Sequence, residues 1–532
     1  MMYFKMKNKF LLLTILFIAA LLRFINLGSL PVTLNRDEGA LAYNGYLLSE
    51  VSKDEWGKNW PISLESFGDY KLVGYPAILA AVFKVFPESD FWVRMPSALS
   101  GVGLVILGFW FARTLKLKKI TSVSLALMLA ITPVFIFYSR IAFEANVALF
   151  IFTLSLGLIF FDVDKPTIVK KIAIVFCYLL SVLTYNTPLL LGLMFLPVII
   201  FIYGYKNWRN WLPVSFGWLL VSVVALIVMR PVFAQKQSIT LFSDNQSVLF
   251  YNEYRSNLPP VLRQIVGNKV IYFSPQIAEN FLRSFSPRFL VTQGGSHPWH
   301  SLPNWGHIYW WQYILALLGL ASAAKIIIGN KKDWNFRSWK NLLERPLKSE
   351  RGRSLVLFLL LGLSLVPSSI TTDAPHATRS LLFFFLLLTF AALAFEKTLK
   401  IMGKPTWIIL FVLMIVSTIR FSKSYFVEYK NDQLMFQPGF SQVIDEIKQN
   451  NPNEKVAIVD GGGYQYILTT WYAHLTPEEY FSTVVRQAPN QIGFRYGQQV
   501  GQFHFIAQEA DRSPEETILV KWTGAEWAKV KF

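Results

Sequence analysis

Long apolar runs alternate with short charged stretches from the start of the sequence to about residue 420. Each run is close to the ~20 residues that an α-helix needs to cross the hydrocarbon core of a bilayer. The pattern therefore predicts about eleven transmembrane helices. They are expected near residues 10–27, 92–112, 120–138, 142–161, 171–186, 188–204, 211–230, 307–328, 354–371, 379–395 and 405–421.

The composition agrees with a polytopic α-helical membrane protein. Hydrophobic residues make up 53% of the 532 residues and charged residues only 16%, against about 25% charged in soluble domains. The net charge is +18, but much of the Lys and Arg lies between apolar runs, as the positive-inside rule requires. The excess of positive charge therefore predicts a membrane partner and no nucleic acid.

The distribution of Lys and Arg predicts which loops face the cytoplasm. If the N-terminus lies inside, the loops that fall inside are all cationic, as the rule demands. These loops are residues 113–119, 165–171, 206–209, 331–353 and 397–404. The same count leaves three long segments outside, at 28–91, 231–306 and 422–532. We therefore expect a multi-pass protein of the inner (plasma) membrane whose active site faces outward.

The predicted domain organisation follows from this topology. Residues 1–421 form a transmembrane domain, in which 28–91 is a first outer loop with surface helices and 231–306 a second long outer loop. The segment 72–86 is apolar but short, which is typical of a helix lying at the membrane surface.

The tail, residues 422–532, has a different pattern. A predicted strand at 455–460 precedes three glycines at 461–463 and a predicted helix at 464–474. The tail is expected to be a small extracytoplasmic α/β domain.

Two adjacent acids, Asp37 and Glu38, follow the first predicted span by about ten residues. A carboxylate near a membrane surface and beside a like charge can serve as a general base. Alternatively, the two acids only begin a helix, where negative charge suits the N-terminal dipole.

Arg140 and Glu144 are four residues apart at the expected outer end of the fourth span. At that spacing the two residues share a helix face and can form a structural ion pair. They can also form the charged wall of an outward-facing cavity, because ionisable groups within spans are costly and tend to mark function.

His376 and Arg379 lie one helical turn apart where the tenth span is expected to begin. An arginine at headgroup depth can hold a phosphate by paired hydrogen bonds, and Lys71, before the predicted surface helix, offers a further cation. The alternative for these cations is ordinary contact with membrane lipids.

His297 and His300 are three residues apart in a loop rich in Gly and Trp. With a carboxylate such as Asp37 they can bind a metal ion, although such loops more often pack aromatic side chains at the interface. No cofactor is required by the sequence, and a divalent metal is the one that it could accommodate.

These segments, in this order, resemble the C-type membrane glycosyltransferases. They are most similar to glycosyltransferase family 39, the dolichyl-phosphate-mannose–protein mannosyltransferase-like group, with bacterial aminoarabinose transferases as relatives. The resemblance covers roughly residues 10–400 and is carried by 23–28, Asp37-Glu38 with Tyr43, 70–76, 94–98, Ser139-Arg140 with Glu144, and 376–379. The chain has Gly74-Tyr75-Pro76 where the family commonly has two prolines, which favours a bacterial relative with another sugar or acceptor.

The resemblance implies roles for the acids and cations. Asp37 matches the essential acid of the first outer loop, which acts as the base or as a metal ligand, with Glu38 beside it. Glu144 matches a second acid, and Arg379 matches a basic residue that contacts the carrier phosphate, with His376, Arg140 or Lys71 in support. The implied reaction is inverting transfer of a sugar from a polyprenyl-phosphate donor to a lipid, glycan or protein acceptor.

Two other functions fit a membrane protein of this kind. A flippase of lipid-linked sugars would carry paired broken helices in two related halves, and no such pairing is visible in the sequence. A polysaccharide ligase acting on a polyprenyl-diphosphate carrier would favour more Arg around the diphosphate.

Overall fold

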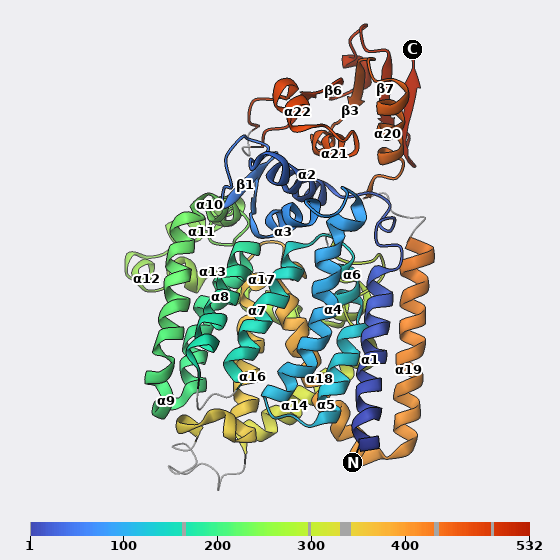
Figure 1. Ribbon diagram of the computed structural model, residues 1–532. Coiled ribbons are helices and arrows are strands. Elements are labelled where there is room, and N and C mark those ends of the chain that lie inside the picture. Colours follow the sequence, from blue (N-terminus) through green and yellow to red (C-terminus); the bar gives the residue numbers. More distant parts are fainter. Residues whose placement is uncertain (1, 162–165, 296–298, 330–341, 430–435, 491–493) are drawn as a thin grey trace. The chain divides into compact units, whose positions relative to one another are not determined.

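The structure is a computed structural model that describes residues 2–161, 166–295, 299–329, 342–429, 436–490 and 494–532. The chain divides into two compact units, which are described separately. Unit 1 comprises residues Met1–Arg23, Leu99–Ser139 and Ala145–Ser422, and unit 2 comprises Phe24–Ala98, Arg140–Glu144 and Lys423–Phe532. Figure 1 labels the elements of both.

Unit 1 is helical, because its long apolar runs must satisfy their backbone groups internally. Its principal helices are α1 (Met2–Phe24), α4 (Asp90–Thr114), α5 (Lys119–Ile131), α6 (Pro133–Ser139), α7 (Glu144–Phe160), α8 (Ile168–Thr184), α9 (Thr187–Val228), α14 (Trp310–Ile328), α16 (Glu350–Ser364), α17 (Val366–Ser369), α18 (Leu381–Met402) and α19 (Lys404–Lys423). Some of these helices extend a few residues into unit 2. A short 3-10 turn, η3 (Pro346–Lys348), precedes α16, and another, η4 (Thr378–Ser380), precedes α18.

The number of membrane-crossing helices is smaller than the eleven predicted. Among the described residues, 7 helices are long and apolar enough to cross a membrane, or 8 if a bent pair counts as one span. Helices do form at the other predicted positions, but Phe10–Phe24 and Glu144–Phe160 fall short of 18 residues, as does α8 with 17. The predicted span at 120–138 is that bent pair, in which α5 and α6 meet at 55°.

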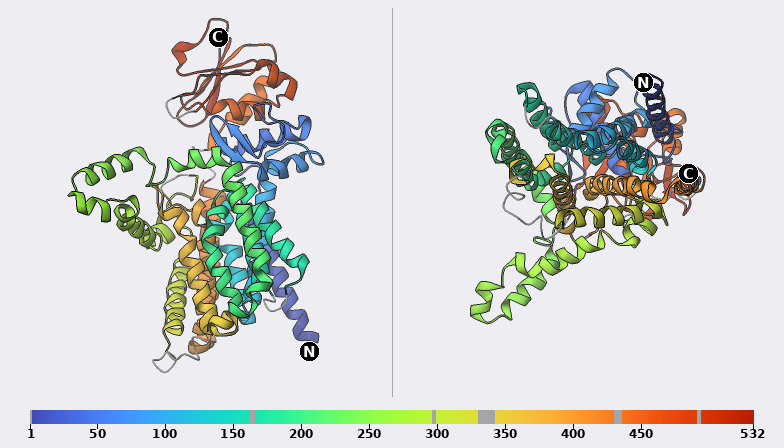
Figure 2. Two further views of the ribbon diagram at one scale, coloured as in Figure 1. Left: turned by 90° about the vertical axis from the view of Figure 1, so that its left-hand side faces the viewer. Right: turned by 90° about the horizontal axis from the view of Figure 1, so that it is seen from below.

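The predicted outer loop 231–306 is largely helical. It contains α10 (Arg230–Gln237), α11 (Asn245–Ser256), α12 (Pro260–Ile265), α13 (Lys269–Arg283) and the π-helical turn η1 (Arg288–Thr292). Figure 2 shows α11–α13 projecting to one side of the other helices of unit 1. The segment packs around its own small core of Leu241, Tyr251 and Phe273.

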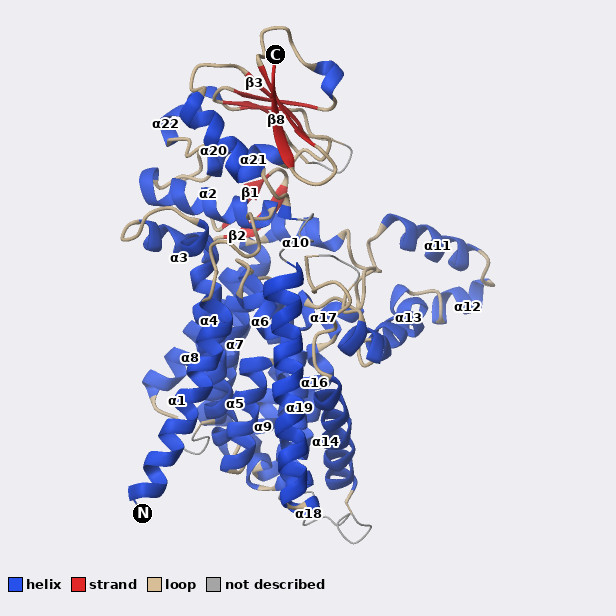
Figure 3. Cartoon of the chain, turned by 90° about the vertical axis from the view of Figure 1, so that its right-hand side faces the viewer, coloured by secondary structure: helices blue, strands red, loops and turns tan. Residues whose placement is uncertain are grey.

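Unit 2 contains the predicted α/β tail. Its sheet has the strand order β4-β5-β6-β3-β7-β8, and the central strand β3 is parallel to both neighbours. Strands are red in Figure 3, where β3 and β8 are labelled. The strands are β3 (Val456–Val459), β4 (Val485–Arg486), β5 (Gly497–Val500), β6 (Phe503–Ile506), β7 (Ile518–Trp522) and β8 (Trp527–Lys531), and the helices are α20 (Phe440–Asn450), α21 (Gln465–Tyr472) and α22 (Pro477–Thr483). The strand, glycine turn and helix predicted at 455–474 are confirmed.

The first outer segment also belongs to unit 2. It contains α2 (Arg36–Val51), a hairpin of β1 (Ser63–Ser66) and β2 (Asp69–Leu72), and α3 (Gly74–Phe83). The apolar helix predicted at 72–86 is therefore present as α3. Helix α3 packs closely on α2. The contact requires a glycine at position 45 of α2, since a Cβ added there would lie only 2.6 Å from the side chain of Leu79 in α3.

Candidate functional site

The two predicted acids lie at the start of α2, in a capping box. The side chain of Asn35 accepts hydrogen bonds from the backbone N–H groups of Asp37 (2.9 Å) and Glu38 (3.0 Å). The Glu38 carboxylate in turn accepts the backbone N–H of Asn35 at 3.0 Å. This reciprocal pattern satisfies otherwise unpaired donors of the first turn. Glu38 therefore has a structural role as the N3 residue of the capping box.

Glu38 also forms a buried ion pair. Nε of Arg94 lies 2.9 Å from Oε1 of Glu38, and the side chains are 0% and 1% exposed. The backbone N–H of Ala142 donates to the same oxygen at 2.9 Å. NH2 of Arg94 donates to the other carboxylate oxygen of Glu38 at 3.2 Å, and further guanidinium N–H groups donate to the carbonyls of Leu27, Pro31 and Thr33. The ion pair of Glu38 and Arg94 therefore links the 27–33 segment to α2.

Asp37 is the more accessible acid, with a side chain that is 32% exposed. Nζ of Lys71 lies 3.0 Å from Oδ1 of Asp37 and 2.7 Å from Oδ2 of Asp69. Asp69 and Lys71 are two residues apart on β2, so their side chains leave the same face of the hairpin. Lys71 is thus shared between two carboxylates, whereas the sequence suggested it as a cation for phosphate.

The charge around Lys71 is strongly negative. Burial by itself would lower the pKa of Lys71, but the nearby carboxylates of Asp37, Asp69 and Glu144 outweigh it and raise the pKa above its ordinary value. Glu144 is buried, at the first turn of α7. Unit 2 therefore gathers three acids around one lysine, and two of these acids, Asp37 and Glu144, were predicted site residues.

The predicted pairing of Arg140 with Glu144 on one helix face is wrong. Helix α6 ends at Ser139 and α7 begins at Glu144, so the residues between them are not helical. Arg140 is buried, and its guanidinium donates to the carbonyls of Asn26 and Leu30 at 3.3 and 3.2 Å. It also lies 5.1 and 4.8 Å from the ring centroids of Tyr425 and Phe426. These contacts give Arg140 a structural role in unit 2.

A second polar cluster lies within unit 1, around Arg379. This arginine is in the 3-10 turn before α18, and its NH1 lies 2.6 Å from Oδ1 of Asp373 and 3.0 Å from Oγ1 of Thr371. Nε2 of His376 lies 3.6 Å from the other carboxylate oxygen of Asp373. Asp373 therefore holds the two basic residues that the sequence predicted to act together.

His300 joins this cluster through its ring. Nδ1 of His300 lies 3.0 Å from Oγ1 of Thr378 and 3.2 Å from Oη of Tyr138, and its ring centroid lies 4.7 Å from that of His376. His297 lies outside the described residues. Within the described ranges, no group of three or more His, Cys, Asp and Glu side chains is arranged to hold a metal ion.

Arg379 also lines a cavity of about 250 Å³ in unit 1, together with Lys236 of α10. The rest of the lining is mostly apolar. It includes Leu189, Leu190, Leu193, Leu226, Phe233, Ile239 and Ile370. An apolar chamber that carries two cations and, among its described lining residues, no acid suits an amphiphile with an anionic headgroup.

Three participants were not singled out from the sequence. Asp69 could have been found from the two-residue spacing to Lys71 in a strand. Lys236 carried no signal, because it lies in a segment predicted only as a loop. Arg94, quoted as part of a motif, lies 56 residues from its partner Glu38, and only the fold brings the two together.

Comparisons with known proteins agree with the membrane architecture. AglB, the oligosaccharyltransferase from Archaeoglobus fulgidus, has been solved with an inhibitory peptide and a dolichol-phosphate. It is 11% identical and matches with a TM-score of 0.51 over 89% of this chain and 64% of its own. Its apo form matches with 12% identity and a TM-score of 0.50 over 88% and 64%. The chain thus spans less than two thirds of the length of these archaeal enzymes.

A weaker structural match and a match to one family model were also found. ArnT from Cupriavidus metallidurans, solved bound to undecaprenyl phosphate, is 12% identical, with a TM-score of 0.39 over 87% of this chain and 84% of its own. No curated protein matches the chain. Residues 73–234, from α3 to α10, match the family described as dolichyl-phosphate-mannose-protein mannosyltransferase. Over this region the chain is therefore similar to that family of membrane glycosyltransferases.

Proposed function

We propose that the protein transfers a sugar from a polyprenyl-phosphate carrier to an acceptor on the outer side of the inner membrane. The observation that carries the proposal is the leucine-lined cavity of unit 1 with Arg379 and Lys236 in its wall. A prenyl chain can occupy the apolar part, and the phosphate can pair with the two cations. The similarity of residues 73–234 to the dolichyl-phosphate-mannose-protein mannosyltransferase family supports the same class of donor.

The proposed chemistry is a single displacement at the anomeric carbon. The bond from that carbon to the phosphate oxygen breaks, and a bond to an acceptor oxygen or nitrogen forms from the opposite face, which inverts the centre. The acceptor proton passes to Asp37, and the polyprenyl phosphate leaves with the electron pair of the broken bond. A positioned carboxylate base contributes on the order of 10²–10⁴ to the rate.

The residues have distinct roles in this proposal. Asp37 is the base, because it is the more exposed of the two predicted acids, and Lys71 orients it. Glu144 contributes to the negative field around Lys71, which suits a sugar that develops positive charge in the transition state. Glu38 is a positioning residue, since its carboxylate already binds Arg94 and two backbone N–H groups.

The phosphate-binding residues are Arg379 and Lys236, with Asp373 and His376 as their support. The hydrogen bond from Arg379 to Asp373 fixes the guanidinium beside the cavity. Cations aimed at the departing phosphate stabilise the charge that develops on it, in a chamber whose apolar walls strengthen the interaction. No step is assigned to a metal ion.

The reaction can be tested with purified protein in lipid nanodiscs and a radiolabelled polyprenyl-phosphate sugar. We expect the label to move to an acceptor while polyprenyl phosphate is released, with inverted stereochemistry by NMR of the product. The same donor in sealed vesicles tests the alternatives. Intact glycolipid that crosses the bilayer without cleavage would identify a flippase, and turnover of only diphosphate-linked donors would identify a polysaccharide ligase.

A further inference from the structure

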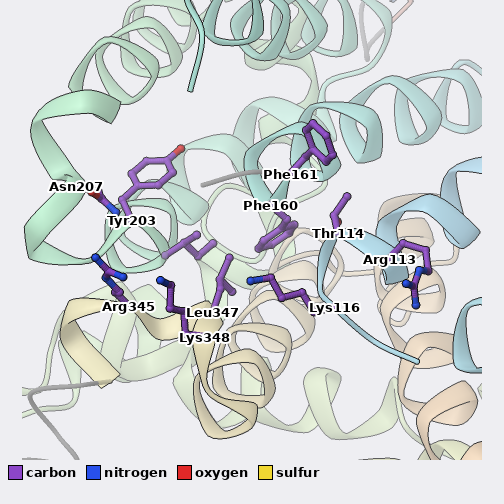
Figure 4. Close-up of a pocket in the computed structure, with 11 residues that line it drawn as sticks. Arg113, Thr114, Lys116, Phe160, Phe161, Tyr203, Asn207, Arg345, Leu347 and Lys348 are labelled. Atoms are coloured by element: carbon purple, nitrogen blue, oxygen red, sulfur yellow. The ribbon is translucent and has the colours of Figure 1, made fainter. Parts of the chain in front are cut away.

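One cavity of unit 1, of about 260 Å³, is separate from the chamber at Arg379. Arg345, Lys348 and Tyr203 are among its lining residues, and Figure 4 shows the Tyr203 hydroxyl pointing away from the two cations. These polar groups therefore do not converge on one ligand. The tail in unit 2 contains a larger cavity, of about 510 Å³, which lies within the range of about 300–1,000 Å³ that small-molecule sites occupy.

This tail cavity lies at the carboxyl ends of the parallel strands. Its lining includes Asp460 and two glycines after β3, Glu509 of the 3-10 turn η8 (Glu509–Asp511) after β6, and Lys521 and Trp522 at the end of β7. The strand order reverses here, because the chain runs from β3 to β4–β6 on one side of β3 and then from β6 to β7 on the other. Ligands of α/β sheets commonly bind in the crevice at such a reversal.

The charged groups of the tail cavity already have partners. Nζ of Lys521 lies 2.8 Å from Oε2 of Glu509. The carboxylate of Asp460 accepts the backbone N–H groups of Tyr464 at 3.1 Å and Gln465 at 2.8 Å, at the start of α21. Among its described lining residues, the cavity therefore offers no unpaired cation to an anion, and a neutral ligand suits it better than an ion.

Two buried side chains in the wall carry unpaired polar atoms. Gln465 is 5% exposed, and its Nε2 donates to Oε1 of Gln437 at 2.6 Å. Trp527 is 7% exposed. Neither Oε1 of Gln465 nor Nε1 of Trp527 has a hydrogen-bond partner among the residues that the structure describes, although buried polar groups are nearly always paired. An unpaired acceptor and an unpaired donor in one wall suit hydroxyl groups, which both donate and accept.

Aromatic rings supply the apolar part of the wall. Trp522 is 36% exposed, and its ring centroid lies 6.2 Å from that of Trp527 at an interplanar angle of 61°. The face of an aromatic ring is electron-rich, so it attracts the C–H groups on the apolar face of a sugar ring. Trp522 therefore offers a stacking surface beside the two unpaired polar atoms.

We propose that the tail cavity binds a neutral pyranose unit of a glycan. Trp522 stacks on the apolar face of the sugar ring, Oε1 of Gln465 accepts a hydrogen bond from one hydroxyl, and the indole N–H of Trp527 donates to another. A peptide also carries donors and acceptors, but extended peptides usually add to the edge of a sheet, whereas this cavity lies at strand ends. The site does not depend on the transfer reaction.

Saturation-transfer difference NMR of the full chain in nanodiscs tests the proposal. The probes are the methyl glycosides of mannose, glucose, galactose and N-acetylglucosamine. We expect wild type to bind at least one of them, and Trp522→Ala to weaken that binding at least tenfold. Trp522→Phe keeps an aromatic face and should retain most of the binding. Gln465→Met removes the unpaired oxygen at similar side-chain length and should weaken binding about threefold to tenfold.

The control and a second arm make the result specific. Trp60→Ala removes an exposed tryptophan of unit 2 outside the cavity and should bind the glycoside as wild type does. An unglycosylated octapeptide of Ser and Ala is the competing probe. Peptide binding that W522A abolishes, with no glycoside bound, would assign the cavity to a polypeptide and overturn the sugar. Equal glycoside binding by wild type and W522A, or no binding of any probe to wild type, would overturn the site itself.

Discussion

Lys71 lies between two carboxylates, with its Nζ 3.0 Å from Oδ1 of Asp37 and 2.7 Å from Oδ2 of Asp69. The hairpin that carries Asp69 and Lys71 thereby fixes the orientation of an acid on α2. One face of Asp37 is held by the lysine, while about a third of its side chain remains exposed (32%). This geometry suits a base that must meet an incoming acceptor.

Replacing Lys71 by Met should impair both transfer and folding. Asp37, Asp69 and Glu144 would lose the positive charge that they share, and like charges at close range repel one another. We expect at least a tenfold loss of transfer and a lower melting temperature in detergent. The control Lys84→Met changes an exposed lysine at the end of α3. Wild-type activity in K71M would contradict a role for this lysine.

The ion pair of Arg94 and Glu38 should be a major determinant of stability. The variant Arg94→Met leaves a buried carboxylate unpaired, which typically costs about 3–5 kcal/mol. We expect a large fall in melting temperature, and a partial recovery in the double variant R94M/E38M, in which neither charge of this pair is left buried. If the double variant were no more stable than R94M, charge burial would not be the cause.

Stability should fall as the pH rises through the range in which Glu55 titrates. Burial raises the pKa of Glu55 from 4.5 to about 7 in the folded chain. Between these two values the folded state binds more protons than the unfolded state, so the free energy of unfolding decreases with rising pH. The total loss is about 3 kcal/mol, and it is complete just above pH 7.

The variant Glu55→Gln cannot ionise and should remove most of this dependence. Melting temperatures of wild type and E55Q between pH 5 and 8 provide the measurement. Asp460 has a pKa raised by burial to about 6 and should leave a residual slope of the same sign. Parallel pH profiles for wild type and E55Q would show that Glu55 is not buried in the folded protein.

Arg379→Ala should weaken donor binding. The guanidinium contributes one of the two cations of the chamber, and charge-assisted hydrogen bonds to phosphate contribute about 1.5–3 kcal/mol each. We expect KM for the polyprenyl-phosphate sugar to rise at least tenfold, and less copurifying polyprenyl phosphate. Arg283→Ala, at an exposed arginine of α13, is the matched control. An unchanged KM in R379A would remove the arginine from the donor site.

The transmembrane helices were the elements that the sequence predicted best, because each is encoded by a long run of apolar residues. Each long apolar run forms a helix, because a helix satisfies its own backbone groups in lipid. Lengths were less predictable, since α7 and α8 have only 17 residues each. The strand, glycine turn and helix of the tail were visible because turn residues separate them locally.

Tertiary contacts could not be predicted from the sequence pattern. The separation of Arg140 from Glu144 was predicted to be one turn of helix, but the chain leaves the helix between residues 139 and 144. Lys71 was predicted as a cation for a phosphate, and its partners Asp37 and Asp69 were missed because they come from α2 and from the other end of its own short strand. Periodicity indicates which face of a helix or strand a residue occupies, but it does not indicate which other element of the fold packs against that face.

In the proposed reaction Asp37 removes the acceptor proton during transfer. Single-turnover transfer from a radiolabelled polyprenyl-phosphate sugar in nanodiscs should fall at least a hundredfold in D37N, with donor binding and melting temperature close to wild type. The control E50Q makes the same change in charge at an exposed position of α2 and should leave the rate unchanged. Transfer by D37N at the wild-type rate would contradict the account.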